Sequence, residues 1–465
     1  MKKNIIFFEI IIALLSTVPT FAETTYLTHD VSNWEVKSFN DCRLDTTKVY
    51  DLRQKGASED EITKAYSEAL YKLQECNDNY FDPFDERNDY SEAEGKALLS
   101  ANKYATELFG KIVADDNFKN KNVVFSPTCM QIALAMLANG MDDKSAYQEI
   151  TTALGKQDMP LDELNALFKK RLYRIQHLDS YDKIGISNAI LLKEGAYYGT
   201  EFLNNTDTYY KALASNVDFC LDSTYTKIDD WAKKSTDGMI PSLGLQPDCN
   251  RMLVMVNALM FQSYWTNQFD PKKTKSSKFV ISSKEEKMVK KMNGTINDNY
   301  AETEEYQLIS VSLNSCKANI ILPKEGVSPK SILSKIDLDN IPYKKAPTGY
   351  RYHIKLSLPK FSTDTRIPLK DLLMKYGMTN TFSKEMNKIA NETKLEEIKQ
   401  LAHLEIDELG VKVSATIISE VLGVGYEPKP IYVDMDVNRP FIITIQDEYE
   451  HEVLFIGLIN DPTEK

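Results

Sequence analysis

One stretch near the C-terminal end constrains the fold more than any other, because a short strand pattern runs directly into a loop. Apolar side chains alternate with polar ones from Val411 to Ile417, and Val421 keeps the same phase. A period of two is typical of a strand with one buried face. Glycines and prolines then recur between residues 423 and 430, which favours a loop. The sequence therefore predicts a strand with no partner next to it in the chain, followed by an exposed, flexible loop.

Composition places the chain among large secreted proteins. Its 465 residues are 42% hydrophobic and 27% charged, which is more than enough for a large core. Residues 1–22 contain two lysines, an apolar run and a small-residue end, the pattern of a secretory signal peptide. No later run approaches the roughly 18 apolar residues that a membrane helix needs. We therefore expect a secreted, extracellular glycoprotein with no membrane partner, and candidate glycosylation sequons begin at Asn204, Asn293 and Asn391.

Charge and cysteine content argue against two protein classes. The net charge of −12 disfavours a nucleic-acid partner. Six cysteines are too few for a disulfide scaffold of this length. Cys42 and Cys76 flank the N-terminal segment and can pair in an oxidising compartment. Three other cysteines lie in apolar runs and are expected to be buried thiols: Cys129, Cys220 and Cys316.

Residues 23–95 differ in composition from the rest of the chain, and we expect them to form an extension before the main domain. Residues 58–76 predict an amphipathic helix, with Ser58 as its N-cap and Glu61 three residues later. Residues 78–94 then form an acidic segment. Such a charge run is usually a solvated linker, and the alternative is a tail that docks on a basic protease surface. An adhesion or scaffold role for the extension is a further hypothesis.

Enzyme motifs are absent from the sequence. The five histidines are scattered, without cysteines or carboxylates at metal-ligand spacing. A Gly-x-Ser-x-Gly elbow, a phosphate-binding loop and a dinucleotide fingerprint do not occur. We therefore expect no enzymatic activity, no metal and no cofactor.

Short motifs from residue 96 onwards occur in a characteristic order. Residues 435–443 read MDVNRPFII. The other motifs are found at residues 122–127, 133–136, 140, 149–150, 154–155, 187–190, 217–219, 228–231, 236–240, 256–274, 358–361, 372, 377–378 and 382. Together with the strand and loop, these motifs resemble the serpins, the serine protease inhibitor superfamily. The resemblance covers residues 96–463 and implies a serpin domain at 96–465, with an α+β fold of three β-sheets, eight or nine helices and an exposed reactive-centre loop.

In serpins the exposed loop is a protease bait that inserts into a large sheet after cleavage. Glu408 and Gly410 match the family's hinge, whereas Val411 and Lys412 replace its usual small residues. The side chains expected to face into the sheet are apolar and mostly β-branched, which favours a strand, and a charge among them would be costly to bury. These inward residues are Val411, Val413, Ala415 and Ile417. We therefore expect the hinge to be able to insert, with Lys412 pointing outward.

The resemblance gives two positions for the reactive bond. Counting forward from Glu408 places it between Val424 and Gly425, whereas counting back from Pro440 places it after Lys429. The number of residues between the hinge and the reactive bond determines how long a strand can insert. The length of this segment is therefore more constrained than the length of the segment after the bond. We therefore favour the bond after Val424.

The residues around these bonds indicate the class of protease. Pro430 disfavours cleavage of the bond after Lys429, and the bond between Tyr426 and Glu427 is the fallback. A small aliphatic Val424 suits an elastase-like pocket, and Tyr426 suits a chymotrypsin-like one. The expected partner is therefore an elastase-like or chymotrypsin-like protease.

The resemblance also assigns a polar cluster beneath the loop, called the shutter. Ser126 and Asn257 match the family there, while Cys129 stands for a second serine and Gln400 for a histidine. These two differences put the timing of sheet opening in doubt, though not the fold.

A basic run resembles the end of the glycosaminoglycan-binding helix of antithrombin, a member of that family. It contains Lys169, Lys170, Arg171 and Arg174. Four cations can attract a sulfated glycosaminoglycan, although a charge run on a helix is more often a solvated face.

Two functional hypotheses follow. The leading one is a monomeric secreted inhibitor that acts as a suicide substrate and traps a serine or cysteine protease through loop cleavage and insertion. The alternative is a non-inhibitory serpin that acts as a carrier, a chaperone or a protein-interaction module, and the unusual hinge and shutter support it.

Overall fold

The computed structural model describes residues 90–176, 183–297, 299–390, 393–395, 398–411, 428–447 and 452–464, with residues 52, 58, 61, 64, 65 and 68. Within these ranges the chain forms nine α-helices and three β-sheets, which confirms the predicted α+β fold class. The signal peptide at 1–22, most of the extension at 23–95, Cys42, Cys76 and the loop at 412–427 lie outside them.

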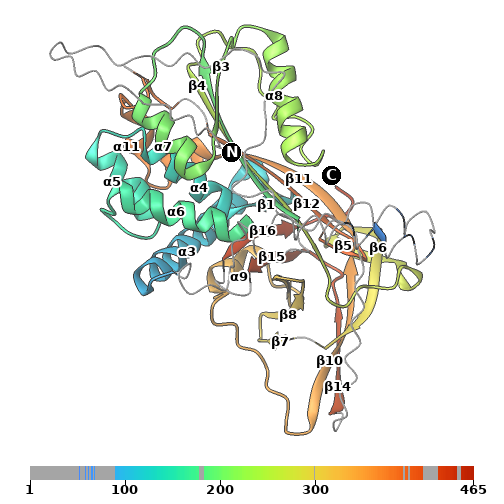
Figure 1. The fold of residues 1–465 in the computed structure, drawn as a ribbon. Helices are drawn as coiled ribbons and strands as arrows, with labels where there is room; N and C mark the ends of the chain where they lie inside the picture. Colours follow the sequence, from blue (N-terminus) through green and yellow to red (C-terminus); the bar gives the residue numbers. More distant parts are fainter. Residues whose placement is uncertain are drawn as a thin grey trace, which may run out of the picture.

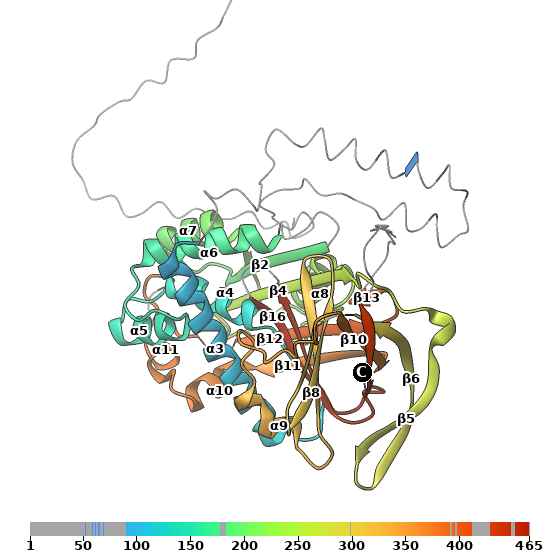
Figure 2. The ribbon, with the colours of Figure 1, turned by 90° about the horizontal axis from the view of Figure 1, so that it is seen from below.

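The helices gather on one side of the sheets. Figures 1 and 2 show α3 to α7 and α11 together on that side and the β5–β6 hairpin on the opposite side. The largest helix is preceded by a capping box, in which Ser91 and Glu94 exchange hydrogen bonds between side chain and backbone. The helices are α3 (Glu92–Ala114), α4 (Pro127–Ala138), α5 (Lys144–Ala153), α6 (Leu161–Gln176), α7 (Thr200–Tyr210), α8 (Asp222–Ser235), α9 (Pro329–Ile332), α10 (Leu369–Lys375) and α11 (Thr379–Ser383).

Two of the sheets contain the last three strands of the chain, β14, β15 and β16. The core sheet contains β15 and β16, whose residues are all buried because helices and strands cover both faces. Its strand order is β1 (Val123–Phe125), β16 (Val453–Ile459), β15 (Phe441–Asp447), β9 (Cys316–Pro323), β8 (Tyr306–Ser312) and β7 (Asn299–Glu302). The outer sheet has the order β14 (Lys429–Asp436), β10 (Tyr350–Pro359), β6 (Glu285–Ile296) and β5 (Lys275–Ser282).

The central sheet positions the functional site. Its strand order is β11 (Phe361–Pro368), β12 (Lys399–Ile406), β13 (Gly410–Val411), β4 (Leu253–Tyr264), β2 (Lys183–Lys193) and β3 (Leu213–Val217). Side chains on β12 alternate between buried and half-buried, the period-two pattern of a strand with one face on the core. The longest strand, β4, pairs along ten residues with β2.

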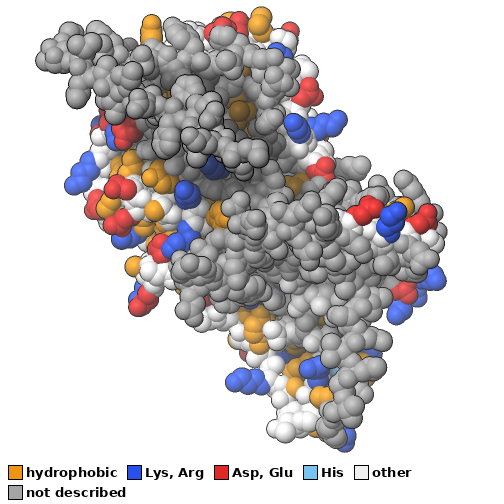
Figure 3. All heavy atoms as spheres, viewed as in Figure 1, with side chains coloured by type: hydrophobic (Ala, Val, Ile, Leu, Met, Phe, Trp, Pro, Cys, Tyr) orange, Lys and Arg blue, Asp and Glu red, His pale blue; other side chains and the backbone are white. Residues whose placement is uncertain are grey.

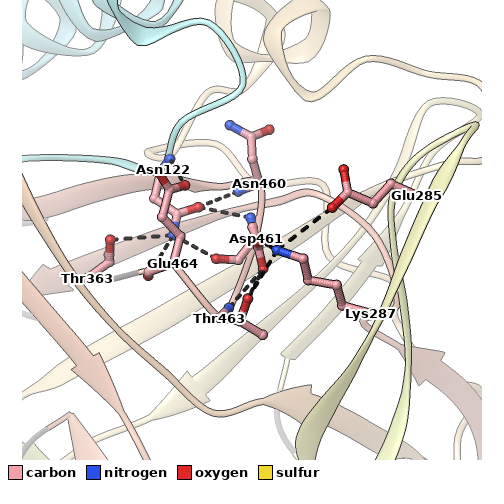
Figure 4. A network of polar contacts seen from close by, with 8 residues as sticks. All are labelled: Asn122, Glu285, Lys287, Thr363, Asn460, Asp461, Thr463 and Glu464. Atoms are coloured by element: carbon pink, nitrogen blue, oxygen red, sulfur yellow. Dashed lines mark hydrogen bonds and ion pairs between the residues drawn. The ribbon is translucent and has the colours of Figure 1, made fainter.

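A polar network holds the C-terminal residues against three strands (Figure 4). The Asp461 carboxylate accepts a hydrogen bond from the Lys287 ammonium of β6 at 2.5 Å and one from the Thr463 hydroxyl at 2.8 Å. The buried Asn122 amide donates to the Asp461 carbonyl at 2.8 Å and to the Thr363 hydroxyl at 3.4 Å. Burial alone would raise the pKa of Asp461, but the hydrogen bonds from Lys287 and Thr463 lower it. The network therefore fixes β6 to the end of the chain.

One cysteine prediction is wrong. Cys220 is not a buried thiol but forms a disulfide with Cys249, and both residues are exposed. Phe219 turns into the core while Cys220 turns outward, and the Asp248 amide donates to the Phe219 carbonyl at 3.1 Å. The two cysteines are 29 residues apart, on either side of α8, so nothing local in the sequence pairs them. Cys129 and Cys316 are buried and free, as expected.

Removing the disulfide should destabilise the protein. Replacing Cys220→Ser and Cys249→Ser opens a loop that spans 29 residues, and we expect the free energy of unfolding to fall by about 3 kcal/mol. Thermal unfolding of the double variant, compared with the wild type before and after reduction, measures the effect. Peptide mapping without reductant should recover a linked peptide pair, and two free thiols at these positions would contradict the assignment.

Candidate functional site: an incomplete strand in the central sheet

The central sheet has an incomplete strand at its middle. β13 consists of Gly410 and Val411, and it pairs antiparallel with β12 on one side and with β4 on the other. Val411 lies opposite Ile406 of β12 and Ser263 of β4. Among the residues that the structure describes, β12 and β4 are 8 and 12 residues long and lie close to each other, but their strand pairing runs only through β13. A longer strand that continues past residue 411 would have to enter between them.

Close packing explains the glycine and the valine of β13. A Cβ on Gly410 would lie 2.2 Å from the Ser263 carbonyl oxygen and 2.7 Å from the Tyr264 Cα, so no larger residue fits there without a shift. The Val411 side chain is 2% exposed and belongs to the hydrophobic core, the inward orientation that the alternation predicts. The other inward hinge residues of the sequence prediction, Val413, Ala415 and Ile417, lie outside the described residues.

Glu408 anchors the hinge just before β13. Its carboxylate forms an ion pair with the Lys360 ammonium and accepts a hydrogen bond from the Thr274 hydroxyl at 2.7 Å. The Glu408 carbonyl accepts from the Phe269 amide at 3.0 Å, and the Trp265 indole donates to the Asp407 carbonyl at 2.8 Å. Burial alone would raise the pKa of Glu408, but the hydrogen bonds from Lys360 and Thr274 hold it below its ordinary value of 4.5. The hinge is thus held by a charged group and not only by the two residues of β13.

Three of the four predicted shutter residues lie together. The Gln400 side chain of β12 exchanges two hydrogen bonds with the Ser126 backbone, accepting from its amide at 2.9 Å and donating to its carbonyl at 2.7 Å. The Ser126 hydroxyl caps α4 by accepting from the Cys129 amide at 3.2 Å, and it donates to the Leu454 carbonyl at 2.7 Å. Gln400 therefore links β12 to the start of α4.

Asn257, the fourth shutter residue, makes its hydrogen bond to the other neighbouring strand, β2. Its amide donates to the side-chain oxygen of Asn188 on β2, and Asn188 in turn donates to the Tyr210 carbonyl at 2.7 Å. Within the part of the chain that the structure describes, the buried Asn257 side-chain oxygen has no hydrogen-bond partner. Burial raises the pKa of the Cys129 thiol to about 12. The four shutter residues therefore include no group that changes its charge near neutral pH.

Comparison with known proteins decides the family. The family model described as Serpin (serine protease inhibitor) matches residues 99–462. This chain is a serpin. Among its relatives are Serpin A3-6 of Bos taurus, 26% identical over 82% of this chain and 92% of that protein, and Alpha-1-antiproteinase 2 of Equus caballus, 25% identical over 82% and 90%.

Solved structures agree with the serpin fold. The thermophilic serpin tengpin in its native state is 25% identical, with a TM-score of 0.69 over 80% of this chain and 95% of tengpin. Human thyroxine-binding globulin is 25% identical, with a TM-score of 0.70 over 80% of this chain and all of that protein. The serpins similar to this one thus include a protein named as an antiproteinase and a protein named for binding thyroxine.

A small hydrophobic core covers β4 and β12 of this serpin beyond the end of β13. The α8 side chains Ile228 and Trp231 pack with Leu243, from the connection between α8 and β4, against Val256 of β4. Leu401 of β12 packs against the same cluster, so the cover spans both strands that flank β13. A strand that enters between β12 and β4 must therefore displace this cover.

The four predicted polyanion-binding cations are not one exposed cluster. Arg171 is fully buried, where its guanidinium pairs with the Glu452 carboxylate at 2.6 Å. Arg174 is also buried and stacks over the Tyr90 ring at 4.8 Å. Lys170 pairs with Glu94 at 3.0 Å, and Lys169 alone among the four is exposed.

Helical periodicity explains this burial. Arg171 lies three residues after Phe168 and four before Ile175, on the apolar face of α6. That spacing was readable in the sequence. Three of the four charges are thus buried or paired, and Lys169 alone does not make the exposed cluster of four cations that the resemblance implied.

The described sequons differ in their surroundings. Asn204 is exposed on α7. The Asn293 amide, the group that would carry a glycan, donates to the carbonyls of Lys273 and Lys291 at 2.9 and 3.0 Å. Asn391 lies outside the described residues. Of the two described sequons, Asn204 is therefore the better placed for glycosylation.

The described residues contain neither a metal-binding cluster nor a membrane-spanning helix. No group of three or more His, Cys, Asp or Glu side chains there is arranged to hold a metal ion. None of the described helices is both long enough and apolar enough to cross a membrane.

Acid should release the hinge anchor. Because the pKa of Glu408 is lowered in the folded hinge, its carboxylate stabilises the hinge above pH 4.5 and loses this effect as the pH falls through the lower folded value. We expect the fluorescence of Trp265 to change below pH 4.5 in a protein whose other tryptophans are phenylalanine. Glu408→Gln is the control and should lack this transition, and an equal transition in both proteins would contradict the assignment.

Breaking the buried ion pair on α6 should destabilise the protein. Arg171→Met leaves the Glu452 carboxylate buried without its cation, and we expect the free energy of unfolding to fall by about 3–5 kcal/mol. The double variant Arg171→Met with Glu452→Gln removes the stranded charge and should recover most of the loss. Denaturant unfolding measures both variants. A single variant as stable as the wild type would mean that Arg171 is solvated and not paired.

Proposed function

We propose that this serpin inhibits a protease as a suicide substrate, by cleavage of its loop and insertion of the hinge as a full strand between β12 and β4. The observation that carries the proposal is the incomplete strand β13, which starts between two longer strands with Val411 already buried on the core side. Insertion would lengthen the existing pairing of β13 with β12 and β4, so no new strand pairing would have to start.

The register of β13 determines the partners of an inserted strand. Because both pairings are antiparallel, each further residue moves one position back along β12 and along β4. Lys412 would then face outward beside Glu405, a charge of opposite sign. The inward residues would come opposite these pairs: Val413 opposite Leu404 and Phe261, Ala415 opposite Ala402 and Leu259, and Ile417 opposite Gln400 and Asn257.

These partners make the unusual hinge compatible with insertion. Leu404, Ala402 and Phe261 are buried and apolar, so the inward hinge residues would be buried among apolar side chains. Burying one valine or isoleucine side chain stabilises a protein by about 1.5–3 kcal/mol. Ile417 would reach the shutter, where the partnerless oxygen of Asn257 lies. The inserted form should therefore have the lower free energy, and the native form is metastable by that difference in free energy.

The proposed reaction begins with attack on the bond after Val424. The protease nucleophile adds to the Val424 carbonyl carbon, the bond to Gly425 breaks, and the Gly425 amine leaves with a proton from the protease. Val424 stays bound to the enzyme as an ester, or as a thioester with a cysteine protease. Insertion of the hinge then carries the acylated Val424 away before water hydrolyses that bond. The bond between Tyr426 and Glu427 is the fallback, and Lys429, already paired in β14 opposite Tyr350, is the least favoured.

The same proposal places the protein outside the cell as a monomer that needs no cofactor. The pattern of residues 1–22 supports secretion. The Cys220–Cys249 disulfide supports it independently, because disulfides persist in oxidising compartments.

A non-inhibitory role is the second candidate. The hinge residues Val411 and Lys412 are larger than those usual in the family, and slow insertion would let the protease complete hydrolysis. The likeness to thyroxine-binding globulin, at 25% identity, shows that the fold also occurs in a protein named for binding a small molecule. The two candidates differ in whether the cleaved loop inserts.

Denaturing gels with a panel of serine and cysteine proteases test the proposal. Elastase-like or chymotrypsin-like enzymes should form a covalent complex and release a C-terminal peptide whose mass begins at Gly425. Val411→Arg should yield cleaved serpin in place of the complex, because the cation would be buried unpaired. Val411→Thr, which keeps the shape and carries no charge, is the control and should still form the complex.

The melting temperature of the cleaved protein gives the contradicting outcome. If no protease is trapped, and if cleaved and intact protein melt together, the loop does not insert and the non-inhibitory candidate is preferred. A released peptide that begins at Pro430 would instead overturn only the choice of reactive bond.

A further inference from the structure

The β5–β6 hairpin has the opposite charge to the rest of the chain. Residues 270–291 contain eight lysines and three acidic residues, a net charge of +5 in a chain whose net charge is −12. They form the short helix η5 (Pro271–Lys273), β5 and most of β6. Three of the lysines have carboxylate partners: Lys278 with Glu286 at 2.9 Å, Lys287 with Asp461 at 2.5 Å and Lys291 with Asp436 at 2.6 Å.

Five lysines of the hairpin have no such partner among the described residues, and all five are exposed. They are Lys272, Lys273, Lys275, Lys284 and Lys290. Figure 3 shows Lys and Arg side chains along the edge of the molecule where Figure 1 draws this hairpin. Exposed lysines without partners raise the local positive potential, which attracts an anionic partner.

Apolar side chains lie among these charges. Met288 is 60% exposed and Val280 is 36% exposed. Met288 pairs across the hairpin with Lys278, and Ser276 pairs with Lys290, so the apolar and basic residues share one outward face. An exposed methionine surrounded by cations favours a protein partner over a polysaccharide, because methionine is enriched in protein interfaces.

The hairpin starts at the hinge of the proposed reactive loop. The Thr274 hydroxyl, next to Lys275, donates to the Glu408 carboxylate at 2.7 Å. At the other end of the loop, β14 begins at Lys429 in the same outer sheet, where β10 lies between it and the hairpin. Figure 2 shows β13, β10 and β6 on the same side of the molecule. A protein that binds the hinge end of the loop therefore lies beside the start of the hairpin.

The hairpin is also held in place. Phe279 of β5 is fully buried and Val289 of β6 is 4% exposed, so the inward face of the hairpin is packed in the core. Lys287 joins β6 to the C-terminal network of Figure 4. The outward lysines are thus presented on a fixed surface, which lowers the entropy lost when a partner binds.

We propose that the outward face of η5, β5 and β6 is a docking surface for an acidic surface patch on the target protease, beside its active-site cleft. This inference rests on the proposed function and names the charge of the partner. The lysines speed the encounter by electrostatic attraction, whereas the loop sequence determines which bond is cut. Among proteases of the same cleavage specificity, the serpin then selects those with an acidic surface.

The rate of complex formation at different ionic strengths tests the docking surface. The triple variant Lys278→Glu, Lys284→Glu and Lys290→Glu is compared with the wild type, using the panel protease that forms the covalent complex fastest. Lys278 and Lys290 lie on the outward face, opposite Met288 and Ser276. At low ionic strength the variant should react about tenfold or more slowly, and the two rates should converge as salt screens the charges. The fraction of attacks that end in a complex should not change, because these side chains point outward from the hairpin and do not form the hinge anchor.

A matched triple variant controls for net charge. Lys119, Lys144 and Lys227 are exposed on other parts of the molecule, and replacing them with glutamate changes the net charge equally. This variant should react nearly as fast as the wild type, and an equal slowing would overturn the docking surface.

Further outcomes separate the docking surface from the proposed function. A complex that forms at an unchanged rate and with an unchanged salt dependence in the hairpin variant overturns the docking surface alone. A slowing that occurs only with added heparin assigns the lysines to a polysaccharide and overturns direct docking. Failure of the wild-type protein to trap any protease of the panel overturns the proposed function, and the docking surface with it.

Discussion

The pairing of Gly410 and Val411 with strands on both sides is the constraint on which the rest of the structure depends. A sheet gains stability from continuous hydrogen bonding between neighbouring strands, and edges without a partner are prone to bind another strand. In the described part of the central sheet, the strand pairing between β12 and β4 runs only through these two residues. The residues that follow them in the chain are suited to enter between the two strands.

Three local features control access to that position. The Glu408 ion pair with Lys360 holds the hinge at the upper end. Gln400 fastens β12 to the start of α4 at the lower end through two hydrogen bonds to Ser126. Leu243 and the α8 side chains cover the face in between. Opening the sheet would break the ion pair of Glu408, the two hydrogen bonds of Gln400 and the apolar contacts of α8. These interactions differ physically, so they respond differently to acid, temperature and salt.

Sequence reasoning was most successful where several short motifs had to occur in one order. The motifs from residue 122 to residue 443 predicted the family, the three sheets and the place of the hinge, whereas periodicity alone would have reached only a large α+β domain. Prediction from the sequence was wrong for residues whose partners are distant in the chain. The apolar neighbours of Cys220 favour a core thiol, but its partner lies across α8 at Cys249. The basic run around Arg171 favours surface cations, although the place of that residue on the apolar face of α6 was visible in the spacing.

The sequence by itself determined the alternation from Val411 onwards, the glycine at 410 and the acidic residue at 408, because strand periodicity and family motifs are local properties. Only the tertiary structure decided what those residues meet. Ser263 crowds Gly410 and Lys360 neutralises Glu408, both from segments more than 45 residues away in the chain, and the core receives Val411. It also set the lysines of β5 and β6 beside the hinge, because contacts between distant segments are fixed by the packing of strands and not by any one of them.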